Sequence, residues 1–381
     1  MKKAVIVSAK RTPIGKVDGI LRTVPPEQMA GTLIQHMVEE NKLDPAEIDD
    51  VILGNVVGPG GNMARLSLLT AGLPVTVPGV TVDRQCGSGL EAISIAARFI
   101  QAGAGDIYIA GGTESTSLAP WKMERPKNLH KGMPRLYERA RFSPDSIGDP
   151  EMGEAAENVA REYGISREDQ DQYALESHVK ASAAQEEGRF DAEIVPVPGL
   201  KHQTDECPRK RTSLKMLSRL PASFVENGTV TAGNSCPVND GASVVFMMSE
   251  EKARELELEP QAEILDTVTA GVDPNLLGIG PVPAVEQCLR RNGLTIKDID
   301  LMEFNEAFAS QVLASLRELD MPLEKVNSSG GGIALGHPYG ASGAIITTRL
   351  CSEMKRHNAE IGIATMGIGG GMGIAALLKK V

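Results

Sequence analysis

One cysteine in this sequence stands where chain geometry favours a reactive thiol. Cys86 follows the apolar, strand-like run 78–82 and precedes the helix-like run 90–98, with Gly87 and Gly89 close beside it. The free N–H groups at the start of a helix favour negative charge, so this position favours the thiolate. An unperturbed thiol would be only about 3% thiolate at pH 7. Two interpretations remain open from this segment alone: a nucleophile, or a buried structural cysteine, which is the commoner fate of a free cysteine.

A nucleophilic thiol needs a base and groups that stabilise an oxyanion. His337 is the candidate base, because glycines lie on both sides of it and Pro338 fixes the turn before a helix-like segment. Asn305 follows the strand-like run 300–304 and opens another helix-like segment. It could cap that helix, or it could orient a water or a carbonyl. Cysteine, histidine and asparagine together also fit a papain-type hydrolase.

Cysteine usage argues against that papain-type reading. The 381-residue chain has five cysteines, an odd number, and no C-x-x-C pair. This pattern argues against a disulfide framework and a zinc site, and it favours a reducing compartment. No apolar run is long enough to cross a membrane, and the first apolar run is short enough to be a β-strand. We therefore expect a soluble, cytoplasmic protein without a bound metal.

Charge is unevenly distributed along the chain. The formal net charge is −11, yet residues 122–141 carry +5 and residues 201–219 carry +4. Two short basic stretches in an acidic protein favour an anionic small molecule over nucleic acid, for which a broader basic face is expected. Either stretch taken alone is more typical of a solvated surface.

The order of strand-like and helix-like segments divides the chain into three parts. Residues 1–118 and 246–381 both alternate strands and helices, which predicts βαβ units, and their Gly-rich turns suggest two related halves. Residues 119–245 look like an insertion that returns to the first half. The expected strands are 3–8, 51–57, 79–82, 106–110, 300–304, one near 326, and 361–366, and the expected helices are 26–41, 89–102, 153–163 and one capped by Ser166.

Three motifs in this order resemble those of the thiolase superfamily, and the resemblance covers nearly the whole chain. They are Cys86-Gly-Ser-Gly, the N-E-A-F motif at 305–308 and the G-H-P-x-G-x-S-G motif at 336–343. The resemblance implies an α/β fold in which two similar βαβαβαββ halves form a five-layered α-β-α-β-α core. It also implies that the inserted loop domain covers the site.

The resemblance further implies substrates and roles. Coenzyme A thioesters would be the substrates, with no tightly bound cofactor, no nucleic acid and no membrane, and the chain would form a homodimer or homotetramer. Cys86 would take the acyl group, His337 would be its base, and Asn305 would hold a water. The Cys86 N–H and an N–H after the Gly cluster near 369 would bind the thioester oxyanion. The residues expected to bind substrate or coenzyme A are Arg209, Cys236, Met152 and Phe308.

One position departs from the family pattern. Gly367 stands where the superfamily usually has a second cysteine that exchanges a proton with the α-carbon of the substrate. Loss of a general acid or base typically costs about 10²–10⁴-fold in rate. Three functions therefore remain open: a thiolase-type acyltransferase with an altered second step, an acyltransferase or thioesterase that performs only the Cys86 half-reaction, and a non-catalytic protein that binds CoA esters.

Overall fold

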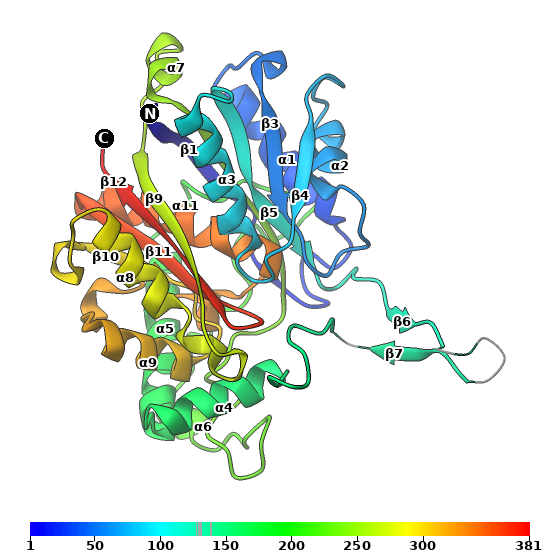
Figure 1. Cartoon of the computed structure of the whole chain (residues 1–381), viewed down its shortest axis with the longest axis vertical. Coiled ribbons are helices and arrows are strands. Elements are labelled where there is room, and N and C mark those ends of the chain that lie inside the picture. The colour runs from blue at the N-terminus through cyan, green and yellow to red at the C-terminus, as the bar shows by residue number, and fades with distance from the viewer. Residues whose placement is uncertain (127, 129–131, 138) are drawn as a thin grey trace.

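The first half of the chain forms a mixed β-sheet. A computed structural model describes residues 1–126, 128, 132–137 and 139–381. Within them, β4, β3 and β5 run parallel, and β8 and β1 continue the sheet in antiparallel pairing (Figure 1). Every residue of β5 and β8 is buried, as expected for strands covered on both faces. The strands are β1 (Ala4–Arg11), β2 (Gly15–Lys16), β3 (Asp50–Gly54), β4 (Gly79–Val82), β5 (Ile107–Ser115) and β8 (Asn239–Ser249).

The second half repeats this plan. β10 and β11 are parallel, and β12 and β9 follow in antiparallel pairing. β9 also pairs with β1 over three residues, so the two sheets are joined along one edge in the order β10-β11-β12-β9-β1-β8-β5-β3-β4. The strands are β9 (Ala262–Gly271), β10 (Leu301–Phe304), β11 (Ile361–Ile368) and β12 (Met372–Lys379).

Helices form three layers around these sheets. α3 and α11 pack against each other between the two halves, and their apolar faces share one core with residues from both sheets. α1 and α2 cover the outer face of the first sheet, whereas α8 and α9 cover that of the second. The layers therefore alternate α-β-α-β-α, as expected. The helices are α1 (Pro26–Glu40), α2 (Met63–Thr70), α3 (Ser88–Ala102), α7 (Glu250–Glu255), α8 (Pro281–Arg291), α9 (Ala309–Leu319), α10 (Gly332–Leu335) and α11 (Tyr339–His357).

The segment between β5 and β8 holds the remaining elements. α4 and α5 pack against α9 of the second half, and a β6–β7 hairpin projects away from the body (Figure 1). The basic stretch 122–141 lies on this hairpin, although residues 127, 129–131 and 138 lie outside the described residues. The division at 118 and 245 stays a prediction. The elements are β6 (Lys122–Glu124), β7 (Arg135–Tyr137), α4 (Met152–Glu162), α5 (Arg167–Glu186) and α6 (Leu214–Leu217).

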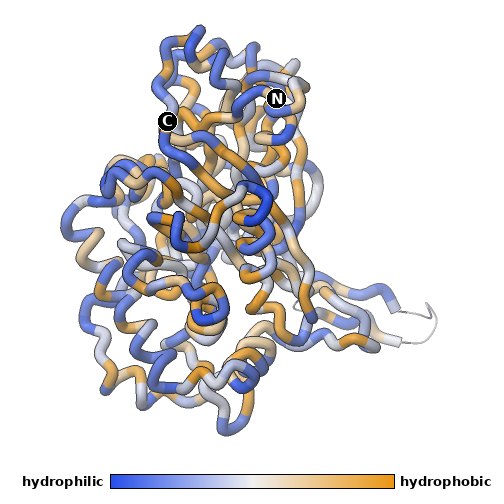
Figure 2. Tube along the Cα trace, turned by 60° about the vertical axis from the view of Figure 1, so that its left-hand side comes forward, coloured by the Kyte–Doolittle hydropathy of each residue, from blue (hydrophilic) through white to orange (hydrophobic). Residues whose placement is uncertain are grey.

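Two expected features differ from the structure. The strand expected near residue 326 is a single bridge between Val326 and Met302, so the second half lacks one strand of the first. The helix expected to open at Asn305 begins at Ala309, and residues 305–308 form a non-helical segment in which the Ala307 N–H donates to the Asn305 carbonyl at 3.1 Å. Hydrophobic and hydrophilic residues alternate along the trace, so both occur in the outer coils as well as in the interior (Figure 2). Among the described helices, none is both long and apolar enough to span a bilayer.

Candidate active site

Cys86 sits at the end of a tight turn between β4 and α3. The residue before it, Gln85, has φ of +42°, a left-handed conformation that costs energy in a residue with a Cβ. Two side chains hold this turn. Asp83 accepts a hydrogen bond from the Gln85 N–H at 2.8 Å, and the Ser88 hydroxyl donates to the Gln85 carbonyl at 2.6 Å. The strained turn is thus fixed by its own neighbours, and it presents the thiol before the first turn of α3.

Cys86 is partly exposed as a residue, and the surroundings of its sulfur favour the thiol over the thiolate. Burial raises its pKa to about 11, against the hydrogen bonds from the Gly369 N–H and its own N–H, which lower it. The expected thiolate from the start of α3 is therefore wrong for the free enzyme, because the cost of burial outweighs those donors. Cys86 needs a base to become a nucleophile. The Gly369 N–H that reaches its sulfur comes from the turn between β11 and β12.

Glycines bring the starts of α3 and α11 together. A Cβ on Gly89 would lie 2.9 Å from both the Gly340 carbonyl oxygen and the Ala344 nitrogen, closer than real Cβ contacts come. The two helices therefore touch backbone to backbone at their first turns. Cys86 precedes α3 and His337 precedes α11. The contact between the first turns of these helices therefore brings Cys86 and His337 toward each other.

Glu114, near the end of β5, holds the start of α11 in place. Its carboxylate accepts hydrogen bonds from the N–H groups of Gly340, Val56 and Val57 and from the Asn55 side chain, at 3.0 to 3.2 Å. Burial raises its pKa to about 7, against those donors. Because the carboxylate ties α11 to β3 and β5, it sets the height of α11 relative to Cys86.

His337 is held as a neutral imidazole in one tautomer. The Ser342 hydroxyl donates its only proton to the Pro338 carbonyl at 2.8 Å, and His337 Nδ1 lies 2.6 Å from the same Ser342 oxygen. Nδ1 must then carry the proton of that contact, so Nε2 bears the lone pair. Nε2 has no hydrogen-bond partner among the described residues, and His337 is 2% exposed. Burial lowers its pKa to about 4, so the ring is a free base at neutral pH.

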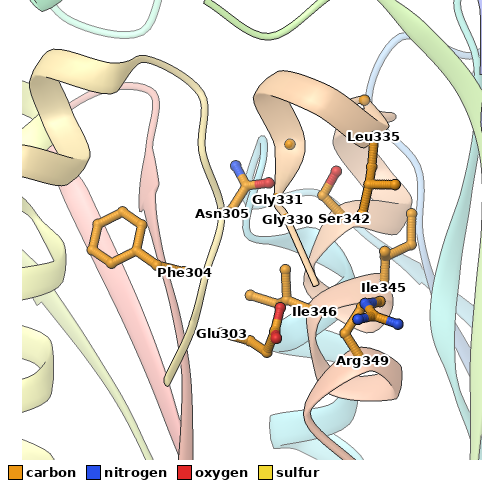
Figure 3. Close-up of a pocket in the computed structure, with 12 residues that line it drawn as sticks. Glu303, Phe304, Asn305, Gly330, Gly331, Leu335, Ser342, Ile345, Ile346 and Arg349 are labelled. Carbon is orange, nitrogen blue, oxygen red and sulfur yellow. The ribbon is translucent and has the colours of Figure 1, made fainter. Parts of the chain in front are cut away.

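Asn305 lines a small cavity between the segment after β10 and the start of α11. The cavity holds about 20 Å³, roughly one water, and it is lined by Asn305, Ser342, Glu303 and Arg349 among others (Figure 3). Asn305 is 2% exposed, and its Nδ2 has no partner among the described residues. An unpaired buried donor is costly, so this amide is prepared for a group that arrives with the substrate. Since α9 begins at Ala309, Asn305 does not cap it.

The neighbouring Glu306 anchors the extended segment that carries Asn305. Its carboxylate accepts hydrogen bonds from Tyr173 at 2.8 Å and Ser177 at 2.7 Å on α5, and from Asn327 at 2.7 Å. The Ile333 N–H of α10 also donates to it at 3.1 Å. This one buried carboxylate therefore ties the insertion to the second half directly under the site. The N-E-A-F motif pointed to Glu306, but nothing in the sequence named its four partners.

Cys236 and Phe308 lie on adjacent extended segments. Ser235 bridges Phe308 in antiparallel fashion, and the Cys236 N–H donates to the Ala307 carbonyl at 2.9 Å. Cys236 is partly exposed, and its pKa responds to charge on Cys86. The Phe308 ring meets Phe224 edge to face at 6.0 Å. Cys236 thus lies near Cys86, and Phe308 lies on the segment that pairs with Ser235 and Cys236.

The two other expected contacts lie farther along the insertion. Met152 begins α4, and the adjacent Gly153 packs on the Phe224 ring. Arg209 is exposed, and its N–H donates to His178 Nδ1 at 3.2 Å. His178 is 4% exposed, and burial followed by the Arg209 charge lowers its pKa to about 4. No contact of the described residues joins Arg209 to Cys86.

Gly367, on β11, faces a buried amide. A Cβ added here would collide with the Gln311 Nε2 atom of α9 and lie 3.4 Å from the Leu277 carbonyl oxygen. Gln311 is 2% exposed, and its Oε1 has no partner among the described residues. The position therefore offers no ionisable group, and the nearest side chain is an amide that can donate or accept a hydrogen bond but cannot exchange a proton at neutral pH.

These features define a class of protein: a five-layered α/β fold with a cysteine and a buried, neutral histidine before the first turns of two touching helices, one from each half. Comparison with known families agrees. Residues 4–251 match the thiolase N-terminal domain and residues 258–380 match the thiolase C-terminal domain. The chain belongs to the thiolase family, and it is an acyltransferase of thiolase type.

Individual relatives agree along the full length. A Staphylococcus haemolyticus protein named "Putative acetyl-CoA C-acetyltransferase VraB" is 51% identical over 383 residues, covering 100% of this chain and 99% of the relative. Its Staphylococcus aureus counterpart from strain MRSA252 is 49% identical, with 100% of both chains covered. The crystal structure of the Bacillus anthracis acetyl-CoA acetyltransferase superposes with a TM-score of 0.93 at 41% identity, covering 100% of this chain and 99% of that one. The predicted fold class is confirmed.

Proposed function

We propose that this thiolase acts on acetyl-CoA and 3-ketoacyl-CoA thioesters through an acyl-enzyme on Cys86. His337 Nε2 takes the thiol proton, and the Cys86 sulfur attacks the thioester or keto carbonyl. The N–H groups of Cys86 and Gly369 stabilise the oxyanion. Coenzyme A leaves with the proton from His337 when the donor is an acyl-CoA. The observation that carries this proposal is the buried His337 ring, whose Nδ1 contacts Ser342 while its Nε2 has no partner among the described residues, so that Nε2 is free to act as the base that the thiol needs.

Asn305 supplies the second polar group of the site. Its unpartnered Nδ2 would hold a water that, with His337, stabilises the oxyanion formed when the acyl group is passed on. The cavity beside it has room for about one water. Removal of one such donor costs about 10²–10³-fold in other enzymes.

Coenzyme A is the proposed carrier and cosubstrate, with its phosphates on the second basic stretch. Arg209, Arg211, Lys215 and Arg219 form no ion pair with another described residue, and all four are exposed. The first basic stretch is less suited, because Arg139 pairs with Asp149 and Glu151 and Arg141 pairs with Asp145. Met152, Cys236 and Phe308 would line the acyl and pantetheine end.

We also propose a homodimer or homotetramer in the cytoplasm. The β6–β7 hairpin region carries exposed apolar side chains, with Trp121 91% and Met133 88% exposed. Apolar groups on a projecting hairpin favour burial against another copy of the chain. Light scattering of the purified protein measures the assembly directly.

Mass spectrometry tests the acyl-enzyme. Incubation with acetyl-CoA should add one acetyl group to the intact protein, and peptide mapping should place it on Cys86. Incubation with acetoacetyl-CoA and coenzyme A should give the same adduct and release acetyl-CoA. Tight binding of the thioester without any adduct would contradict the proposal and leave a non-catalytic CoA-ester-binding protein.

A second candidate function rests on Gly367. Because no ionisable side chain stands there, the chain could stop after the Cys86 half-reaction and pass the acyl group to water or another thiol. Exchange of acetyl-CoA α-protons in D₂O separates the two functions. Exchange supports a complete thiolase, whereas acylation without exchange supports the half-reaction.

A further inference from the structure

Cleavage of a 3-ketoacyl thioester needs a proton donor in addition to the nucleophile, and this point rests on the proposed function. When the bond between C2 and C3 breaks, C2 becomes the carbanion of a thioester enolate and must receive a proton. Gly367 cannot supply it, and the facing Gln311 is an amide. His337 is already committed to the Cys86 proton. Two other titratable groups lie near enough to Cys86 for their charges to interact with it. They are the Cys236 thiol and the Tyr339 phenol.

The backbone places Cys236 beside the segment that carries Asn305. The Cys236 N–H donates to the Ala307 carbonyl, and the Ala309 N–H donates to the Asn234 carbonyl, both at 2.9 Å. This bond pattern sets Cys236 directly opposite Ala307, and opposite residues of an antiparallel pair project from the same face. The small Ala307 side chain leaves that face open to the thiol.

The same extended segment continues to His337. Val238 forms a parallel bridge with His337, and the His337 N–H donates to Asn239 Oδ1 at 2.8 Å. Cys236 therefore lies between the Asn305 segment and the His337 turn. Asn305 Nδ2 and His337 Nε2 are both buried and have no partner among the described residues, so both can bind a polar group of the substrate. A thiol in this gap is placed beside a bound substrate.

We propose that Cys236 is the catalytic proton donor to the α-carbon in 3-ketoacyl-CoA cleavage. The Cys86 sulfur bonds to C3, the C2–C3 bond breaks, and C2 takes the proton from the Cys236 sulfur. Acetyl-CoA then leaves. Coenzyme A gives its thiol proton to the Cys236 thiolate, and its sulfur attacks the acyl carbonyl on Cys86. The Cys86 thiolate leaves and recovers its proton from His337, which returns both thiols to the start.

The electrostatics of the gap suit a donor. Burial raises the pKa of Cys236 well above its usual range, and charge on Cys86, Glu306 and Cys207 raises it further, against only its own N–H. The thiol is consequently protonated at neutral pH and holds a proton ready for a carbanion. Tyr339 packs its ring edge to face on His337 at 5.2 Å, and its hydroxyl makes no hydrogen bond within the described part of the chain. The phenol is therefore the competing donor.

Cys236→Ser tests the assignment, because serine keeps the shape but its hydroxyl is a far weaker acid. Two steps are measured on each variant: acetylation of Cys86 by acetyl-CoA, and deuterium incorporation into acetyl-CoA in D₂O together with acetoacetyl-CoA cleavage. Acetylation should stay within about threefold of the parent. Exchange and cleavage should fall by about 10²-fold or more, the usual effect of a lost general acid.

Further variants and the parent protein serve as controls for the assignment of Cys236. Cys288→Ala removes a buried thiol in the core of the second half and should leave both steps unchanged. Cys236→Ala should repeat the Cys236→Ser result. Retained exchange in Cys236→Ser overturns the assignment, and loss of exchange in Tyr339→Phe alone would transfer it to the phenol. If neither Cys236 variant is acetylated, the thiol serves the first step and the assignment is also wrong. Failure of the parent protein to be acetylated would instead overturn the proposed function.

Discussion

The two sides of this site are unequally equipped. On the side of Cys86, the Gly369 N–H donates to the sulfur, and His337, the proposed base, precedes the helix whose first turn touches that of α3. On the side of β11, Gly367 faces the Gln311 amide and the Leu277 carbonyl, neither of which titrates. Attack on a carbonyl needs a nucleophile, a base and an oxyanion donor, and the first side has all three. Exchange at an α-carbon needs a titratable group, which the second side lacks. The comparison teaches that acylation and proton transfer at carbon are separable in this chain, so variants should separate them.

Cys86→Ala should give the largest loss, because it removes the group that bonds to the acyl carbon. We expect no acetyl adduct on the intact protein and a fall in acetoacetyl-CoA cleavage of at least about 10⁴-fold, as for other deleted nucleophiles. Stopped assays of coenzyme A consumption measure the cleavage. Substantial residual cleavage would mean that another thiol, such as Cys236, can accept the acyl group, and the contrast between the two sides would disappear.

His337→Gln should reduce Cys86 acetylation by about 10²–10⁴-fold, the range for a lost general base. The pH dependence of Cys86 acetylation in the parent protein gives a second test of this role. Burial holds the pKa of His337 at about 4, below its usual 6.5, so the ring stays neutral from pH 8 down to 5. Parent acetylation should therefore lose its histidine-dependent rate only as pH falls toward 4. An acid limb centred at 6.5 would show that the histidine is solvated, and it would contradict the buried geometry.

Asn305→Ala should have a smaller effect, about 10²–10³-fold on overall turnover, because it removes one oxyanion donor and leaves the nucleophile and base. The loss should fall on the transfer of the acyl group to its acceptor. Rapid-quench mass spectrometry should then show acetyl-Cys86 accumulating. A loss confined to the formation of the adduct would place Asn305 in the first step instead.

Much of this arrangement could be predicted from the sequence. The turn at Cys86 and the glycine-flanked His337 are local signals, and the alternation of elements fixes which sheets and helices bring them together. The capping box at Ser166 likewise predicted the start of α5, and both of its hydrogen bonds are present.

The rest depends on contacts between distant segments. The buried state of His178 could not be predicted, because the residue that covers its Nδ1 lies 31 positions away. The raised pKa of Cys86 also escaped prediction, because helix-start electrostatics can be inferred from local order but burial cannot. The Gln311 amide at Gly367 is a third such case, since it joins α9 to β11.

Gly367→Cys should have the smallest effect, and it tests most directly whether the β11 side of the site lacks a proton donor. A thiol on β11 would give the second side a titratable group, provided that the flexible Gln311 side chain moves aside. We expect exchange and cleavage to rise by about tenfold, well short of the 10²–10⁴-fold available to a well-placed acid or base. Cys86 acetylation should not change. The double variant Gly367→Cys with Gln311→Ala should rise further, because it removes the collision while Gln311→Ala alone adds no acid. If the double variant gains nothing over the parent, the empty position at 367 does not limit the second step, and the proton is already supplied from elsewhere in the site.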